Sequence, residues 1–186
     1  MSSHHIVREK QEPALYIHYL GSFSEEYLGQ LLEWSPTLIV NAPVYVKVIS
    51  LGLKVDVVVD SIEMDFQENT RVISPKSEEL DAVLDYLIEE RYSAVNVIDS
   101  KSNLRELGAY IEAINIVVFT ETEKSYAIKS GFRVWKPKGS IFNIEVLSYF
   151  ETSNLKQVED GKFEVIDDGF VEFIFNVPYL FISERL

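Results

Sequence analysis

The stretch that decides the fold runs from Lys54 to Asp65 and reads KVDVVVDSIEMD. Its apolar part, Val55 to Val59, is rich in β-branched residues, which are typical of a strand. Acidic residues follow at once, at Asp60, Glu63 and Asp65. Ligands of parallel α/β sheets bind at the carboxyl ends of strands, where acids suit metal and phosphate chemistry. The stretch therefore predicts a buried strand that ends at a binding site.

Strands and helices are expected to alternate on both sides of this stretch. The expected strands are 14–20, 37–40, 54–59, 72–73, 94–98 and 114–120, and the expected helices are 25–34, 44–51, 75–91 and 104–113. Such alternation is typical of a parallel sheet with crossover helices. The first part of the chain is therefore predicted to be α/β, with a doubly wound, mostly parallel sheet.

Residues that favour helix ends support three of these helices. Ser24 is predicted to cap the first helix, and Ser74 to cap the third, with Pro75 at its first position. Asn103, followed three residues later by Glu106, forms a capping box for the fourth.

The pattern changes near Glu121, after which the segments have a period of two and predict only strands. The expected strands are 126–128, 132–135, 141–147, 162–166, 170–175 and 179–182. Asp167-Asp168-Gly169 is predicted to join two of them in a hairpin. We therefore expect an α/β domain over residues 1–123 and a small all-β, sandwich-like domain over 124–186, with Pro137-Lys138-Gly139 as a candidate linker.

Composition limits the classes of partner. The 186 residues carry a net charge of −13, which repels nucleic acid and anionic membranes, so neither is an expected partner. Cysteine is absent, which excludes disulfides and thiolate metal sites. There is no signal-like or membrane-spanning apolar run. These features predict a soluble, cytoplasmic protein.

Other candidate features have simpler interpretations. His4-His5 is interpreted as part of a mobile end, and His18 as a half-buried histidine with satisfied hydrogen bonds. Gly21 to Ser24 has the pattern of a helix cap more than that of a phosphate loop. The aromatic residues after Ser148 are compatible with two roles, a core or a subunit interface.

A resemblance to a known family rests on segments spread along the chain. They are Gly29 to Val40, Leu51 to Val58, Asp85 to Ile88, Ala94 to Val97, Gly139 to Phe142 and Thr152 to Leu155. In this order they resemble thiamine pyrophosphokinase. The resemblance implies an α/β domain followed by a thiamine-binding β module, a homodimer, and transfer of a pyrophosphoryl group from ATP to thiamine with Mg²⁺.

The family's motifs are altered where this chain matches them. Its Gly-Asp-Phe-Asp-Ser motif falls on Asp60 to Met64, so that Asp60 replaces the glycine and Ser61 and Glu63 replace the two aspartates. Two further acidic positions of the family fall on Glu79 and Glu106. The cation of the Lys-x-Thr-Asp segment is absent, and so is a hairpin whose Ser-Asn pair helps to hold thiamine.

The resemblance implies a set of site residues. Glu63, Glu79 and Glu106 would be catalytic, and Glu63 and Glu79 would bind the metal. Asp60, Ser61, Ser140 and Thr152 would contact nucleotide or thiamine.

Two functions remain open. The first is a dimeric binding or scaffold protein that has lost catalysis, needs no cofactor, and binds thiamine or a related small molecule. The second is an active thiamine pyrophosphokinase that uses Mg²⁺ and ATP at a rebuilt glutamate site.

Overall fold

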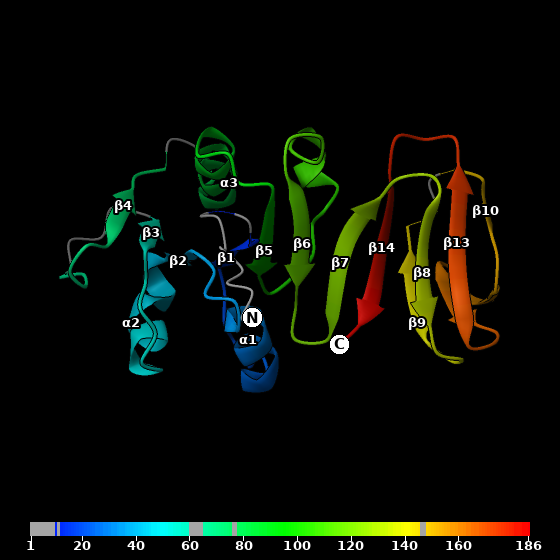
Figure 1. Cartoon of the computed structure of the whole chain (residues 1–186), viewed down its shortest axis with the longest axis horizontal. Coiled ribbons are helices and arrows are strands. Elements are labelled where there is room, and N and C mark those ends of the chain that lie inside the picture. The colour runs from blue at the N-terminus through cyan, green and yellow to red at the C-terminus, as the bar shows by residue number, and fades with distance from the viewer. Residues whose placement is uncertain (1–9, 11, 60–64, 76–77, 146–147) are drawn as a thin grey trace, which may run out of the picture. The chain divides into compact units, whose positions relative to one another are not determined.

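The computed structural model describes residue 10 and residues 12–59, 65–75, 78–145 and 148–186. They belong to two compact units (Figure 1). The first comprises the described parts of 1–101 and 109–116, and the second those of 102–108 and 117–186. The predicted domain boundary after residue 123 lies at the start of a strand of the second unit, and it stays a prediction.

The first unit contains a parallel sheet. Its strands lie in the order β5-β1-β2-β3-β4, and every pair along this row is parallel. Figure 1 shows them from β4 at the left to β5. The bounds are β1 Ala14–Ile17, β2 Leu38–Asn41, β3 Val57–Val59, β4 Arg71–Ile73 and β5 Ala94–Ile98.

The valine strand is buried, as the sequence predicts. Val57, Val58 and Val59 are at most 2% exposed. β1 and β2 are also buried at every position, because neighbours cover both faces of these strands. Asp56 precedes β3 and accepts a hydrogen bond from the backbone N–H of Leu38 at 2.9 Å, so its carboxylate ties β3 to β2.

The described residues of this unit form three α-helices: α1 Glu25–Leu32, α2 Ala42–Ser50 and α3 Glu79–Glu89. The predicted cap Ser24 is confirmed, since its hydroxyl accepts from the N–H of Tyr27. The predicted start of α3 is wrong, because Glu78 and not Ser74 is its N-cap. The apolar residues at helical spacing begin only at Leu80, so burial supports the helix from there and not from Pro75.

The predicted helix 104–113 is also wrong. The structure has only a short 3₁₀ helix, η1 Glu106–Ala109. The N–H of Leu107 donates to the carbonyl of Leu104 at 3.1 Å, three residues back. Gly108 lowers helix propensity, and of η1 only Leu107 is buried, so little apolar burial would hold a longer α-helix.

The described strands of the second unit form two antiparallel rows. One has the order β11-β12-β9-β14-β7-β6 and the other β10-β13-β8. The bounds are β6 Asn115–Phe119, β7 Glu123–Ile128, β8 Phe132–Lys136, β9 Ile141–Ile144, β10 Phe150–Thr152, β11 Leu155–Glu159, β12 Lys162–Val165, β13 Gly169–Phe175 and β14 Leu180–Arg185. The chain passes from the first unit into the second within β6. The row from β5 to β4 is thus parallel, the pairs of the second unit from β6 onward are antiparallel, and the doubly wound arrangement stays a prediction.

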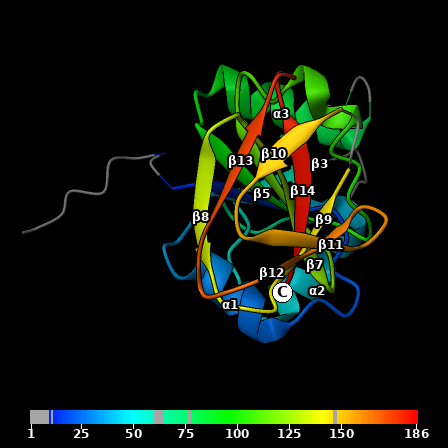
Figure 2. The same cartoon turned by 90° about the vertical axis from the view of Figure 1, so that its right-hand side faces the viewer.

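Apolar side chains of both sheets form the core of the second unit, as in a sandwich. Its buried members are Ile128, Phe142, Ile144, Phe163, Val165, Val171, Phe173, Phe175, Leu180 and Ile182. The core interpretation of the aromatic residues is therefore confirmed for several of them. Figure 2 shows this unit from the side of β8, β10 and β13.

The structure differs from the β prediction in several details. Asp167-Asp168-Gly169 does not join a hairpin, because β12 pairs with β9 and β11 whereas β13 pairs with β8 and β10. The turn carries the chain from one sheet to the other. The strands β10 and β11 were not expected, since β11 has almost no buried residue to give a period of two. Pro137 to Gly139 connects β8 to β9 inside the second unit.

Candidate functional site

A cluster of ionisable residues lies at the carboxyl edge of the parallel sheet. His18 follows β1 directly, and Asp99 follows β5 directly. β1 and β5 are neighbours, with Ile17 opposite Ile98. The strand order reverses between them, because β2, β3 and β4 extend to the other side of β1. Such a reversal point is where open α/β sheets bind ligands.

Glu79, the first residue of α3, completes this cluster. His18 Nδ1 lies 2.9 Å from Asp99 Oδ2, and His18 Nε2 lies 3.2 Å from Glu79 Oε2. The interpretation of His18 as half-buried and hydrogen-bonded is confirmed, since its side chain is 30% exposed. The imidazole therefore has a carboxylate at each ring nitrogen.

These contacts shift two pKa values in opposite directions. The hydrogen bond with Asp99 raises the pKa of His18, against the effect of burial, and Glu79 raises it further. Burial alone would raise the pKa of Asp99, but its contacts with His18 and with Ser100 outweigh burial and lower it. Both shifts favour a charged pair of imidazolium and carboxylate.

Tyr16 lies beside this cluster. Its ring centroid is 5.9 Å from that of His18, and the residue is fully buried. Burial raises the pKa of its hydroxyl, and the carboxylates of Glu79 and Asp99 raise it further. The phenol is therefore neutral at physiological pH.

The predicted metal site can be tested only in part. Asp60, Ser61 and Glu63 lie outside the described residues. Within the described ranges, no three His, Cys, Asp or Glu side chains are grouped as metal ligands. Glu79 faces an imidazole whose raised pKa favours a positive charge, which repels a cation at the same oxygen. The described residues therefore do not fit Mg²⁺, and the set of Glu63, Glu79 and Glu106 stays a prediction.

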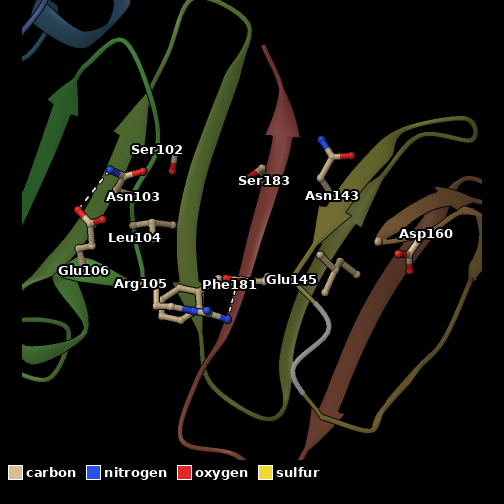
Figure 3. A pocket seen from close by; sticks show the side chains of 12 residues that line it. Ser102, Asn103, Leu104, Arg105, Glu106, Asn143, Glu145, Asp160, Phe181 and Ser183 are labelled. Carbon is tan, nitrogen blue, oxygen red and sulfur yellow. Dashed lines mark hydrogen bonds and ion pairs between the residues drawn. The ribbon is translucent and has the colours of Figure 1, made fainter.

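The second unit contains a pocket of about 530 Å³ (Figure 3). Its wall combines the segment before η1 with β9, β14 and the turn between β11 and β12. The lining residues are Ser102, Asn103, Leu104, Arg105, Glu106, Asn143, Ile144, Glu145, Asp160, Gly161, Phe181 and Ser183.

The charged residues of this pocket are mostly acidic. Arg105 makes an ion pair with Glu145 at 2.5 Å, and Asn103 donates to Glu106 at 3.2 Å. Figure 3 shows both contacts, with Asp160 apart from them and Phe181 beside Arg105. Three carboxylates and one guanidinium line the pocket, so its net charge is negative.

The structure separates the predicted site residues of the β module from this pocket. Ser140 donates to the carbonyl of Pro137 at 2.8 Å, and Thr152 donates to the carbonyl of Ser153 at 3.3 Å. Neither residue lines the pocket. Of the predicted site residues that the structure describes, only Glu106 does. The roles assigned to Ser140 and Thr152 stay predictions.

Several residues of both clusters were missed. Asp99 gives the same signal as Asp60, an acid directly after a buried strand, and could have been found in that way. Asp160-Gly161 is a typical turn sequence, and a turn sequence by itself does not indicate a ligand-binding residue. Asn143 and Phe181 carry no signal that distinguishes them from other residues of a strand.

Comparison with known proteins identifies the fold. Neither a protein-family model nor a curated protein matches the sequence. Among solved structures, thiamine pyrophosphokinase from Bacillus subtilis has a TM-score of 0.68 at 12% identity and covers 92% of this chain and 97% of its own. A probable thiamine pyrophosphokinase from Staphylococcus saprophyticus has a TM-score of 0.67 at 14% identity. The match covers 93% of this chain and 98% of that protein.

Further similar structures span a wide range of organisms. A protein from Lactobacillus plantarum has a TM-score of 0.70 at 10% identity and covers 93% of this chain and 97% of its own. Yeast thiamin pyrophosphokinase has a TM-score of 0.62 at 7% identity. The match covers 97% of this chain and 88% of the yeast protein. The α/β unit, the β unit and these similarities along almost the full length lead to one conclusion: this chain has the fold of the thiamine pyrophosphokinases.

Proposed function

We propose that this protein binds a small organic cation, thiamine or a relative of thiamine, in the pocket of the second unit, and that it does not transfer pyrophosphate. The acidic lining of that pocket carries the proposal. Three carboxylates line it, those of Glu106, Glu145 and Asp160, with a single guanidinium, that of Arg105. A positively charged ligand would reduce the repulsion among these carboxylates.

Other properties of the pocket suit a heterocyclic ligand. Its volume lies within the usual range of about 300–1,000 Å³ for small-molecule sites. Phe181 offers an aromatic surface for stacking or a cation–π contact. Asn143 and Ser183 offer polar groups beside the carboxylates, and such groups fix the orientation of a ligand.

Loss of transfer is supported by the first unit. The carboxylate of Glu79 is engaged by His18, and Asp99 is engaged by His18 and Ser100. In the sequence, Ser61 and Asp60 stand where the resembling family has an aspartate and a glycine. Catalytic residues act as a unit, so that loss of one removes most of the activity. Several altered positions therefore support loss of transfer more strongly than one would.

The alternative function is an active pyrophosphokinase with a rebuilt acidic site. The carboxylates of Asp99 and Glu79 at the reversal point of the sheet favour it, because this edge is the usual place for nucleotide chemistry. An assay that detects AMP formed from ATP in the presence of thiamine and Mg²⁺ discriminates between the two functions. We expect no AMP above the background of a protein-free sample.

We also propose that the protein is a homodimer that works in the cytoplasm. The exposed aromatic residues of the β unit support the dimer. Tyr149 is 79% exposed and Phe170 is 50% exposed, although other aromatic residues of this unit form its core. Aromatic residues are enriched in subunit interfaces. None of the described helices has the length and apolarity needed to cross a membrane.

The binding proposal is tested by calorimetry with thiamine and with two variants. Asp160→Asn removes a pocket carboxylate, and we expect the dissociation constant to rise about threefold to tenfold, up to ~1.4 kcal/mol. Glu159→Gln is the matched control, because Glu159, the last residue of β11, adjoins Asp160 but does not line the pocket. Equal affinity of both variants for thiamine would contradict the proposed site.

A further inference from the structure

We propose that Glu145 receives the positive charge of the ligand in the pocket of the second unit, and that the guanidinium of Arg105 occupies this position until the ligand displaces it. This inference rests on the proposed function and names the subsite at which the cation binds. The contact between Arg105 Nη2 and Glu145 Oε1, at 2.5 Å, carries the inference (Figure 3).

The three carboxylates of the pocket differ in their partners. Glu106 accepts a hydrogen bond from the side-chain amide of Asn103 at 3.2 Å, and that donor is neutral. Asp160 lies apart from the other charged groups in Figure 3. Among the described residues that line the pocket, Glu145 is the carboxylate that pairs with a cation. Its oxygen is therefore where the structure places a positive charge.

The group that contacts Glu145 has the chemistry expected of the ligand. A guanidinium is a planar cation with a delocalised charge, and a cationic heterocycle shares both properties. Phe181 also lines the pocket, and its carbonyl accepts a hydrogen bond from the backbone N–H of Glu145 at 3.2 Å. The two residues therefore lie side by side, and a cation held at Glu145 lies close to an aromatic ring.

The backbone around Glu145 is held on two sides. Its own N–H is bonded to Phe181 of β14. The N–H of the preceding residue, Ile144, donates to the carbonyl of Gly161 at 2.7 Å, in the turn between β11 and β12. A carboxylate on a fixed backbone suits a binding residue, because little conformational freedom is lost when the ligand arrives.

Arg105, in contrast, can leave this position easily. Its side chain is 60% exposed and that of Glu145 is 46% exposed, and ion pairs as exposed as this one are weak. Rotation of the long side chain moves the guanidinium into solvent without a change in the backbone. A ligand with a stronger contact to Glu145 can therefore take its place.

Displacement predicts that Arg105 weakens the binding of a cation. The ligand must replace an existing ion pair, and it then lies near the displaced positive charge. Arg105→Gln removes both effects, so the dissociation constant for thiamine should fall about threefold to tenfold. Arg105→Met removes the same charge with a different side chain and should give the same gain.

Two control variants match this change. Lys101→Gln removes a positive charge four residues earlier in the chain, and Lys101 does not line the pocket. Arg105→Lys keeps the charge at the same position. Both variants should bind thiamine within about twofold of the wild type. A gain in Lys101→Gln as large as that in Arg105→Gln would show a general effect of net charge and would overturn the inference.

A double-mutant cycle tests the displacement itself. Glu145→Gln should weaken thiamine binding, because it removes the carboxylate that receives the cation. In the wild type this loss is partly offset, since the ligand no longer has to replace the ion pair. The weakening should therefore be roughly twofold to fivefold greater in the Arg105→Gln background than in the wild type. An equal weakening in both backgrounds would overturn the displacement.

Calorimetric titration with thiamine gives the four dissociation constants of the cycle, and thermal unfolding checks that each variant is folded. Weaker binding by both Arg105→Gln and Arg105→Met would show that Arg105 itself holds the ligand, and would overturn the inference while the proposed function stands. No binding of thiamine by any of the chains at millimolar concentration would overturn the proposed function, and the subsite with it.

Discussion

Replacing His18 by alanine should destabilise the first unit in a pH-dependent way. The change removes the contacts with Asp99 Oδ2 at 2.9 Å and with Glu79 Oε2 at 3.2 Å. Hydrogen bonds to charged groups contribute about 1.5–3 kcal/mol each in favourable cases. Asp99 is 17% exposed and Glu79 is 38% exposed, so solvent screens the second contact more.

These contributions add to a loss of about 2 kcal/mol, most of it from the contact with Asp99. For a protein of this size, such a loss lowers the melting temperature by about 4–8 °C. Lys54→Ala is the control, because Lys54 is 71% exposed and lies 3.9 Å from Asp56. The control should melt within about 1–2 °C of the wild type.

The pH dependence follows from the directions of the two pKa shifts. The raised pKa of His18 means that its contribution to stability is full below the unfolded-state value of about 6.5 and is lost as pH rises through the folded value. The lowered pKa of Asp99 means that its contribution is present above about 3.9 and is lost as pH falls through the folded value. The difference between wild type and His18→Ala should be largest near pH 5.5 or so.

Thermal unfolding at about pH 5.5 and at about pH 9 measures this difference directly. We expect the gap in melting temperature at the higher pH to be less than half of that at the lower pH. An equal gap at both pH values would refute the ionic basis of the cluster and leave only a packing role for the imidazole.

Three further changes should alter stability in the second unit, each followed by denaturant unfolding. Phe173→Ala opens a cavity in the buried core and should cost about 3–5 kcal/mol of unfolding free energy. Glu184→Ala leaves Lys136 without its buried partner and should cost about 3–5 kcal/mol, whereas Glu159→Gln at the surface should cost less than about 1. Gly161→Ala should cost at least about 1 kcal/mol, because φ is +68° and a Cβ would lie 3.2 Å from the carbonyl oxygen of Ile144.

The strands of the first unit could be predicted because their residues carry the signal themselves. Val57 to Val59 is an apolar run that is buried on both faces, so local pattern and burial agree. Helix ends were predicted only where a side chain acts locally, as Ser24 does. The start of α3 depends on where apolar burial begins. Ser74 and Pro75 have the pattern of a helix start, but the helix begins at Glu79.

Partnerships between distant residues could not be predicted in this way. His18 was expected to be hydrogen-bonded, but nothing local shows that Asp99 and Glu79 are its partners, since they are 81 and 61 residues away. The pocket likewise gathers Asn103, Asn143 and Asp160 from three separate segments. Strand order in the sheets brings such residues together, and the period of the sequence does not encode that order.

The most direct test of the account is a calorimetric titration of the wild-type protein with thiamine in the presence of Mg²⁺ and ATP, followed by an assay for AMP. We predict saturable binding of one thiamine per chain without formation of AMP. No heat of binding at millimolar thiamine would contradict the proposed pocket ligand, and AMP formed in proportion to protein would contradict the loss of transfer.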